Sequence, residues 1–281
     1  MHAMTANRDQ AARELLAFYE EAGVNVPLDE APTNRFAPDP LPTKRGEIVQ
    51  SGVGGTLFST LARDLAPKHR PVVTSQLPLA PETAVMAARE AAKSTASLEE
   101  LRAILERFEG CALRTTATQL VFADGNPQSR VMFVGEAPGR EEDLQGLPFV
   151  GRAGRLLDRM LAAIGLDRGS TYIANIVPWR PPGNRTPTPQ ECAICLPFML
   201  RQIELADPDV LVCLGAPSMQ TLLNVKEGIL KTRGRWFNFQ TGTRDIHAMA
   251  TLHPAYLLRQ PLQKRLAWRD FLAVKKMLET A

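Results

Sequence analysis

The sequence predicts an α/β protein, a three-layer α/β/α fold with a central, mostly parallel four-stranded sheet and an N-terminal extension. From about residue 130 onward, short apolar segments typical of buried strands alternate with longer segments of helical periodicity. A helix that links two neighbouring strands usually leaves them parallel, so this alternation indicates repeated strand-helix-strand units. The first part of the chain lacks such a pattern.

Four strands and four helices are expected in the periodic part. The strands are short apolar runs bounded by Gly, Pro or polar residues, at 130–135, 171–177, 209–215 and 248–254. The helices are expected at 154–166, 189–206, from 216 onward and at 265–279. Ligands of such sheets bind at the carboxyl ends of the strands, so residues that follow strands are the candidates for a site.

Residues 1–95 are expected to form the extension, and residues 96–281 the sheet domain. Residues 8–22 have the spacing of a short amphipathic helix, and residues 26–82 are Pro-rich, as in a linker. Ser97 and Glu100 then form the pattern of a capping box that opens the first helix of the domain.

Charge and cysteine content limit the class of protein. The formal net charge is only +3, but residues 1–110 contain 12 Lys and Arg against 15 Asp and Glu, so basic charge lies with the later part of the chain. No apolar stretch is long enough for a membrane span, and an apolar signal core is absent at the N-terminus, so we expect a cytoplasmic protein. Its four cysteines are then expected as thiols or metal ligands and not as disulfides.

Polar residues occur at three predicted strand ends. Gly135-Glu136-Ala137-Pro138-Gly139 follows the first strand, Asn175 lies near the end of the second, and His253 follows the fourth. Each alone is compatible with a turn, a backbone hydrogen bond or a structural histidine. Together they supply a carboxylate, an amide and an imidazole at one edge of the sheet. Phe149 is expected close to the same turn, as an aromatic surface of the site or as a core residue.

The reactions compatible with this set are few. The sequence contains no GxSxG, GxxxxGK[ST], HExxH or GxGxxG motif, which removes the usual support for acyl transfer, nucleotide hydrolysis, zinc proteolysis and dinucleotide redox chemistry. An aromatic ring, an amide, an imidazole and a carboxylate instead suit a nucleobase that is flipped out of DNA.

Five ordered motifs over residues 105–281 resemble the family 4 uracil-DNA glycosylases. They are Gly135-Glu136-Ala137-Pro138-Gly139 with Glu142-Asp143, Pro148-Phe149-Val150-Gly151 with Ala153-Gly154, Asn175, the run from Arg180 to Pro189, and His253-Pro254-Ala255-Tyr256-Leu257-Leu258-Arg259. The resemblance implies hydrolysis of the N-glycosidic bond of deoxyuridine in DNA, with release of uracil and an abasic site as products. We expect a monomer that acts on single- and double-stranded uracil-containing DNA and has no membrane partner.

The resemblance also implies a role for each matching residue. Glu136 corresponds to the acidic residue near the attacking water, and Glu142 to a second acidic residue that supports the site. Phe149 corresponds to the stacking surface, Asn175 to the residue that recognises the uracil edge, and His253 to the residue that stabilises the departing uracil. Gly135 and Ala137 complete the expected uracil-binding set.

DNA contacts are expected from Arg185 and from the segment after His253. By the resemblance, Leu257, Leu258 and Arg259 of this segment correspond to the loop that enters the minor groove. Residues 231–281 contain 10 Lys and Arg against 3 Asp and Glu. We therefore expect phosphate contacts from Lys231, Arg233, Arg235 and Arg244, and we assign Lys275 and Lys276 to a solvated helix face.

The chain departs from the family at its four-iron cluster. Cys111 and Cys195 stand at two family ligand positions, whereas Phe108 and Trp179 occupy the other two. Cys192, one helical turn from Cys195, is a candidate third ligand, whereas Cys213 falls in a predicted strand and is expected in the core. Because such a cluster normally requires four thiolates, we predict no metal and no cofactor.

Two alternatives remain. A relative that traps uracil-DNA covalently would carry a basic insertion with a nucleophilic His before the Thr186-Pro187 segment, and residues 182–187 contain neither. A non-catalytic binding or scaffold protein would use the N-terminal 95 residues to recruit a repair partner.

Overall fold

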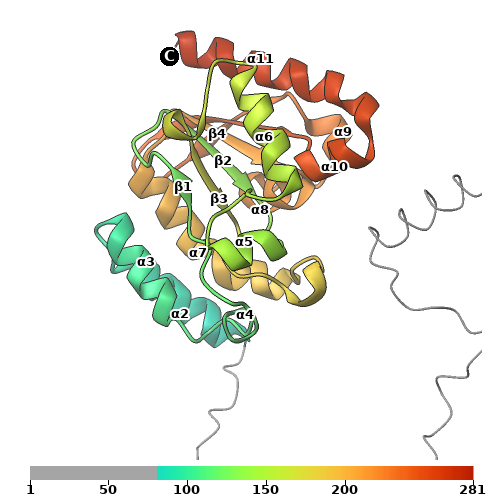
Figure 1. The fold of residues 1–281 in the computed structure, drawn as a ribbon. Helices are drawn as coiled ribbons and strands as arrows, with labels where there is room; N and C mark the ends of the chain where they lie inside the picture. Colours follow the sequence, from blue (N-terminus) through green and yellow to red (C-terminus); the bar gives the residue numbers. More distant parts are fainter. Residues whose placement is uncertain (1–80, 281) are drawn as a thin grey trace, which may run out of the picture. The chain divides into compact units, whose positions relative to one another are not determined.

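The computed structural model describes residues 81–280, and the predicted helix at 8–22 and the linker up to residue 80 lie outside them (Figure 1). The four predicted strands form the parallel centre of the sheet. They are β2 (Val131–Gly135), β3 (Tyr172–Asn175), β4 (Val210–Leu214) and β6 (Asp245–Thr251), in the order β3-β2-β4-β6. Their parallel pairing confirms the predicted fold class.

Two antiparallel edge strands extend the sheet to six, so the prediction of four strands was incomplete. β1 (Asp124–Gly125) pairs with β3, and β5 (Trp236–Gln240) pairs with β6. β1 has only two residues, and β5 is partly exposed. Neither therefore has the continuous apolar run of a strand buried on both faces.

Helices cover both faces of the sheet (Figure 1). The helices are α2 (Pro81–Lys93), α3 (Leu98–Arg107), α4 (Leu113–Thr116), α5 (Arg140–Gln145), α6 (Arg152–Ala162), α7 (Pro189–Ala206), α8 (Ala216–Leu223), α9 (Ile229–Thr232), α10 (Pro254–Arg259) and α11 (Lys264–Thr280), with 3-10 turns at Arg168–Ser170, Pro182–Asn184 and Pro261–Gln263. Successive strand residues point to opposite faces. Val131 and Phe133 pack with α6 and α11, whereas Met132 and Val134 pack with α3, α7 and α8.

The caps confirm the predicted starts of α3 and α7, whereas the helix predicted at 154–166 is α6, which begins at Arg152 and ends at Ala162. Ser97 accepts a hydrogen bond from the amide of Glu100 at 3.2 Å and begins α3. Thr188 and Glu191 form a capping box at the start of α7, which has the predicted bounds. α2 precedes the predicted domain start at residue 96 and packs along α7. Among residues 81–280, no helix is both long and apolar enough to cross a bilayer.

Candidate active site

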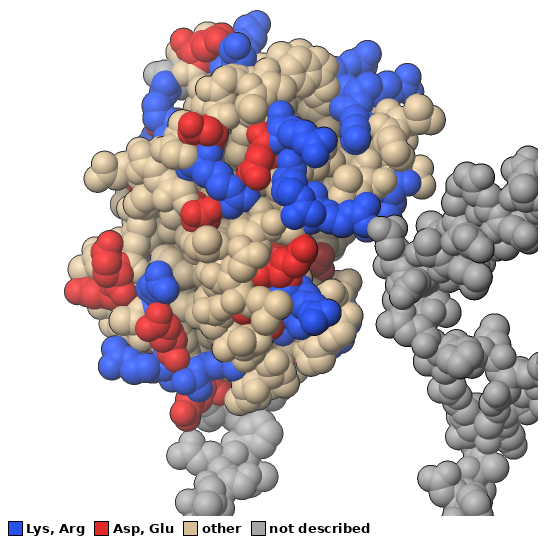
Figure 2. Space-filling model, viewed as in Figure 1, with Lys and Arg blue, Asp and Glu red and all other residues tan. Residues whose placement is uncertain are grey.

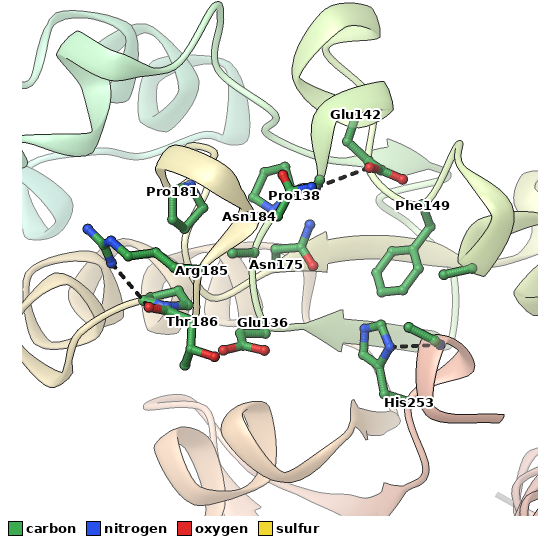
Figure 3. Close-up of a pocket in the computed structure, with 15 residues that line it drawn as sticks. Glu136, Pro138, Glu142, Phe149, Asn175, Pro181, Asn184, Arg185, Thr186 and His253 are labelled. Carbon is green, nitrogen blue, oxygen red and sulfur yellow. Dashed lines mark hydrogen bonds between the residues drawn. The ribbon is translucent and has the colours of Figure 1, made fainter. Parts of the chain in front are cut away.

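A pocket opens at the carboxyl ends of β2 and β3 and beside the loop that follows β6 (Figure 3). The predicted residues that line it are Glu136, Ala137, Glu142, Phe149, Asn175, Arg185 and His253. They come from segments up to 117 residues apart in the chain, counted from Glu136 to His253. The parallel strands bring them together because their carboxyl ends share one edge of the sheet.

Gly135 forms the base of this arrangement. It is the last residue of β2 and pairs with Asn175, the last residue of β3. A Cβ atom at Gly135 would collide with the amide oxygen of Asn175 and with the ring of Phe149. The absence of a side chain at Gly135 is therefore what lets these two groups face the pocket together.

Two buried polar atoms of the pocket lack a hydrogen-bond partner among the described residues. They are the Oδ1 atom of Asn175 and the Oε1 atom of Glu136. Buried polar atoms are nearly always paired, because leaving one unpaired costs about 1–3 kcal/mol. Both atoms are thus suited to bind a ligand or water. Burial also raises the pKa of the Glu136 carboxyl above its usual range.

His253 precedes α10, and its Nδ1 atom accepts a hydrogen bond from the amide of Ala255 at 3.1 Å. The proton of a neutral imidazole must then be on Nε2, which becomes a donor. Burial, with a smaller effect of the nearby Arg259 charge, lowers the pKa of His253 to about 4. At neutral pH the side chain is therefore an uncharged donor of fixed tautomer.

Phe149 forms another wall of the pocket, with its ring centroid 5.6 Å from that of His253. Its backbone has φ +56°, a left-handed conformation that is unfavourable for a residue with a side chain. Arg168 stabilises this conformation because its guanidinium donates hydrogen bonds to the carbonyl oxygens of Pro148, at 3.1 Å, and of Phe149. Gly154 leaves the space that the Phe149 carbonyl needs.

The surroundings of Arg168 fix its own position. Its guanidinium forms ion pairs with Asp124 at 2.5 Å and with Asp158 at 2.9 Å. These carboxylates belong to β1 and α6, so one side chain connects the sheet edge, the neighbouring helix and the Phe149 turn. Sequence patterns gave no indication of this role for Arg168, because its contacts are with residues distant in sequence.

Glu142 has a structural position in the pocket wall. Its carboxylate accepts hydrogen bonds from the amide of Gly139 at 3.1 Å and from that of Gly151 at 2.9 Å. It therefore holds the turn after β2 against the turn before α6. Glu136, in contrast, has an oxygen without a partner among the described residues and is the acidic group available to a ligand.

The residues expected to contact DNA differ in their solvent exposure and in their ion pairing. Leu258 and Arg259 are exposed, whereas Leu257 is fully buried with Leu252 and Ala267, so its side chain supports α10 and does not face solvent. Arg185 forms a bidentate ion pair with Glu191.

Three of the four cations expected at phosphates also have protein partners. Arg233 is paired with the buried Asp270, Arg235 with Glu227, and Arg244 with Asp207 and Asp209. Lys231 is exposed and has no ion-pair partner among the described residues. The excess of basic residues after residue 231 is thus partly compensated by carboxylates that only the fold brings close.

The residues at the family cluster positions do not fit a four-iron cluster. The side chains of Cys111 and Cys195 are buried in the same hydrophobic cluster. Phe108 packs edge-on against Phe198 at a centroid distance of 4.9 Å, and Trp179 is 2% exposed. Two rings thus stand where ligands would be needed. Within residues 81–280, no three His, Cys, Asp or Glu side chains form a group that could hold a metal ion.

The fold and pocket define an α/β protein with a pocket of polar and aromatic residues at the carboxyl edge of a parallel sheet. The family model of the uracil DNA glycosylase superfamily matches residues 122–272. The chain is 45% identical over 166 residues to the type-4 uracil-DNA glycosylase of Thermotoga maritima, covering 57% of this chain and 85% of that protein. It is 39% identical over 179 residues to the Archaeoglobus fulgidus type-4 enzyme, covering 62% and 90%.

The chain therefore belongs to the uracil-DNA glycosylase superfamily and, within it, to the type-4 uracil-DNA glycosylases. The resemblance inferred from the five motifs is confirmed.

The role of Arg168 can be tested through the conformation of Phe149. We expect Arg168→Ala to weaken binding of free uracil by about tenfold, because the left-handed turn loses its two carbonyl contacts; this corresponds to about 1.4 kcal/mol. Quenching of intrinsic fluorescence by uracil measures the effect. The control is Arg130→Ala, which removes an ion pair with Asp209 at the amino-terminal ends of β2 and β4, away from the pocket. Equal losses in both variants would contradict the positioning role.

The state of His253 is open to direct measurement. Nitrogen-15 NMR of the imidazoles should show His253 as the neutral Nε2-H tautomer at pH 7, titrating near pH 4. The unfolded histidine titrates near pH 6.5. Between about pH 6.5 and pH 4 the unfolded chain therefore binds a proton that the folded protein does not, so the free energy of unfolding falls as the pH is lowered through this range. A His253 titration near pH 6.5 would contradict burial as the cause.

Proposed function

We propose that the pocket is the site at which this type-4 uracil-DNA glycosylase hydrolyses the N-glycosidic bond of deoxyuridine in DNA, releasing uracil and leaving an abasic site. The protein is a hydrolase of DNA repair. One observation carries the assignment of residues: the unpaired atoms of Asn175 and Glu136 border the same pocket as the stacking surface of Phe149 and the donor of His253.

Uracil recognition follows from the groups of the pocket. A base in the pocket would stack on Phe149, which already packs near the His253 ring. The free Oδ1 atom of Asn175 is an acceptor suited to the N3-H of uracil, and the amide nitrogen is a donor suited to the adjacent carbonyl oxygen. This pair of contacts distinguishes uracil from cytosine, whose N3 carries no proton.

Bond cleavage requires stabilisation of charge on both fragments. As the glycosidic bond breaks, negative charge develops on uracil and positive charge on the sugar. The Nε2-H of His253 is placed to donate to uracil O2, and as a neutral donor it is suited to stabilise the anion without transferring its own proton. Glu136 is suited to orient the attacking water, and its carboxylate would stabilise the cationic sugar.

We further propose how the remaining predicted residues meet DNA. The exposed Leu258 and Arg259 are the candidates for insertion into the space left by the flipped nucleotide. Arg185 would need to share or leave Glu191 to contact a phosphate. We propose that the protein acts as a monomer on single- and double-stranded DNA. Because the substrate is DNA, we propose a cytoplasmic location.

We also propose that this chain holds no iron-sulfur cluster. Phe108 and Trp179 replace two of the four family ligands, and the rings are integrated in the core that surrounds α7. Each aromatic side chain of this size buries about 150–250 Å², so hydrophobic packing is the source of stability that we assign to this region.

The pocket assignment predicts a large loss of uracil release in two variants. His253→Ala and Asn175→Ala should each slow single-turnover cleavage of a uracil oligonucleotide by at least about tenfold, or about 1.4 kcal/mol in the barrier. Asn238→Ala on edge strand β5 and His247→Ala are matched controls on exposed positions. Cleavage at the wild-type rate in both pocket variants would refute the assignment.

The same assay separates the alternatives. Alkali-labile sites without a stable adduct on a denaturing gel are the expected products. A shifted protein-DNA band would instead indicate covalent trapping, and binding without any product would indicate a scaffold protein.

The cluster proposal has a gain-of-function test. Wild-type protein purified without oxygen should contain no stoichiometric iron and no visible absorbance band of a cluster. The double variant Phe108→Cys/Trp179→Cys restores a four-cysteine set with Cys111 and Cys195, and we expect it to acquire iron and such a band on reconstitution. Either single variant, with three thiols at the family positions, is the control. Iron and a cluster band in the wild-type protein would overturn the proposal.

A further inference from the structure

We propose that the exposed basic face of α6, together with the cations at the end of α10 and the start of α11, binds the DNA backbone beside the uracil pocket. We call this the α6 basic face. It consists of Arg152, Arg155 and Arg159 on α6 and of Arg259, Lys264 and Arg265 on the neighbouring segment. The proposal rests on the function proposed above, since it assigns a further surface to the same DNA substrate.

The spacing of the three arginines of α6 places them on one side of the helix. Arg152, Arg155 and Arg159 are three and four residues apart, which is the repeat of one helix face, and all three are exposed. They extend over about 10 Å of helix axis. A DNA strand has one phosphate for about every 3.4 Å of its axis. The length of the row is therefore sufficient for more than one phosphate contact.

The surface is continuous with the pocket. Ala153, in the first turn of α6, lines the pocket, and Leu156 of α6 packs in one cluster with Leu257 of α10. α10 carries the exposed Leu258 and Arg259 that we propose to enter the DNA. Figure 2 shows Lys and Arg gathered over α6 and the adjoining ends of α10 and α11. A strand whose nucleotide enters the pocket would thus pass close to these cations.

The charges of the α6 basic face are not compensated by protein carboxylates. None of its six cations forms an ion pair with a residue among 81–280. The carboxylate within α6, Asp158, is bound to Arg168, and the buried Asp270 of α11 is bound to Arg233. This contrasts with Arg233, Arg235 and Arg244, whose charges are partly compensated. Free cations are those that release counterions when they bind phosphate.

The salt dependence of DNA binding tests the proposal. The probe is a fluorescein-labelled duplex with one uracil nucleotide that carries a 2′-fluorine and resists hydrolysis, titrated by fluorescence anisotropy over a KCl series. The double variant Arg155→Ala/Arg159→Ala avoids the pocket lining. For each phosphate that the variant no longer neutralises, the slope of log K against log[KCl] should become shallower by about 0.9, or about 1.8 for the pair. The same change is expected with undamaged duplex, because phosphate contacts do not read sequence.

The control removes two arginines from the other layer of helices. Arg89 and Arg107 lie on α2 and α3, are exposed and have no ion pair among the described residues. Arg89→Ala/Arg107→Ala should keep the wild-type slope. An unchanged slope in Arg155→Ala/Arg159→Ala, or an equal change in the control, overturns the proposal.

Cleavage by the wild-type protein, measured in parallel, separates this proposal from the proposed function. If the wild-type protein releases uracil and the slope does not change, the α6 basic face fails alone. If the slope changes as expected while the wild-type protein releases no uracil, the surface stands and the proposed activity fails.

Discussion

The parallel pairing of β2 with β3 determines the geometry of the whole pocket. This register places Gly135 beside Asn175, and the missing side chain of Gly135 leaves room for the Asn175 amide and the Phe149 ring. A register shifted by one residue would turn Asn175 to the other face of the sheet. The base recognition that we propose therefore depends on backbone hydrogen bonds that do not touch the base.

Burial shifts the pKa values of two ionisable groups of the pocket, Glu136 and His253, toward the neutral form. Burial raises the pKa of Glu136 and lowers that of His253, so in both cases the neutral form becomes more favourable. For His253 this yields an uncharged donor at neutral pH. For Glu136, positive charge that develops on the sugar would favour the carboxylate again. In the proposed reaction, the positive charge of the sugar would thus be balanced by Glu136, whose ionisation the pocket opposes in the absence of substrate.

In the region around Cys111 and Cys195, packed side chains occupy positions at which the family resemblance implies cluster ligands. Cys111 and Cys195 are buried in one hydrophobic cluster with Trp179 and residues of α7, and Phe108 packs against this cluster. In a protein interior packed at crystal-like density, rings of this size leave little free volume. Similarity to the relatives establishes the family, and the packing supports our proposal that this region is stable without a cluster.

The sequence by itself determined where the central strands and the main helices lie along the chain and which polar residues stand at the strand ends. It could do so because apolar periodicity and turn residues are local signals. It also indicated the replacement of Cys by Phe108 and Trp179. Only the tertiary structure showed the edge strands β1 and β5, the burial of Leu257, and the hydrogen bonds from Arg168 to the carbonyl oxygens of the Phe149 turn. It alone separated the cations paired with carboxylates from those of α6. Pairing and burial depend on contacts between residues far apart in the chain, which no local pattern encodes.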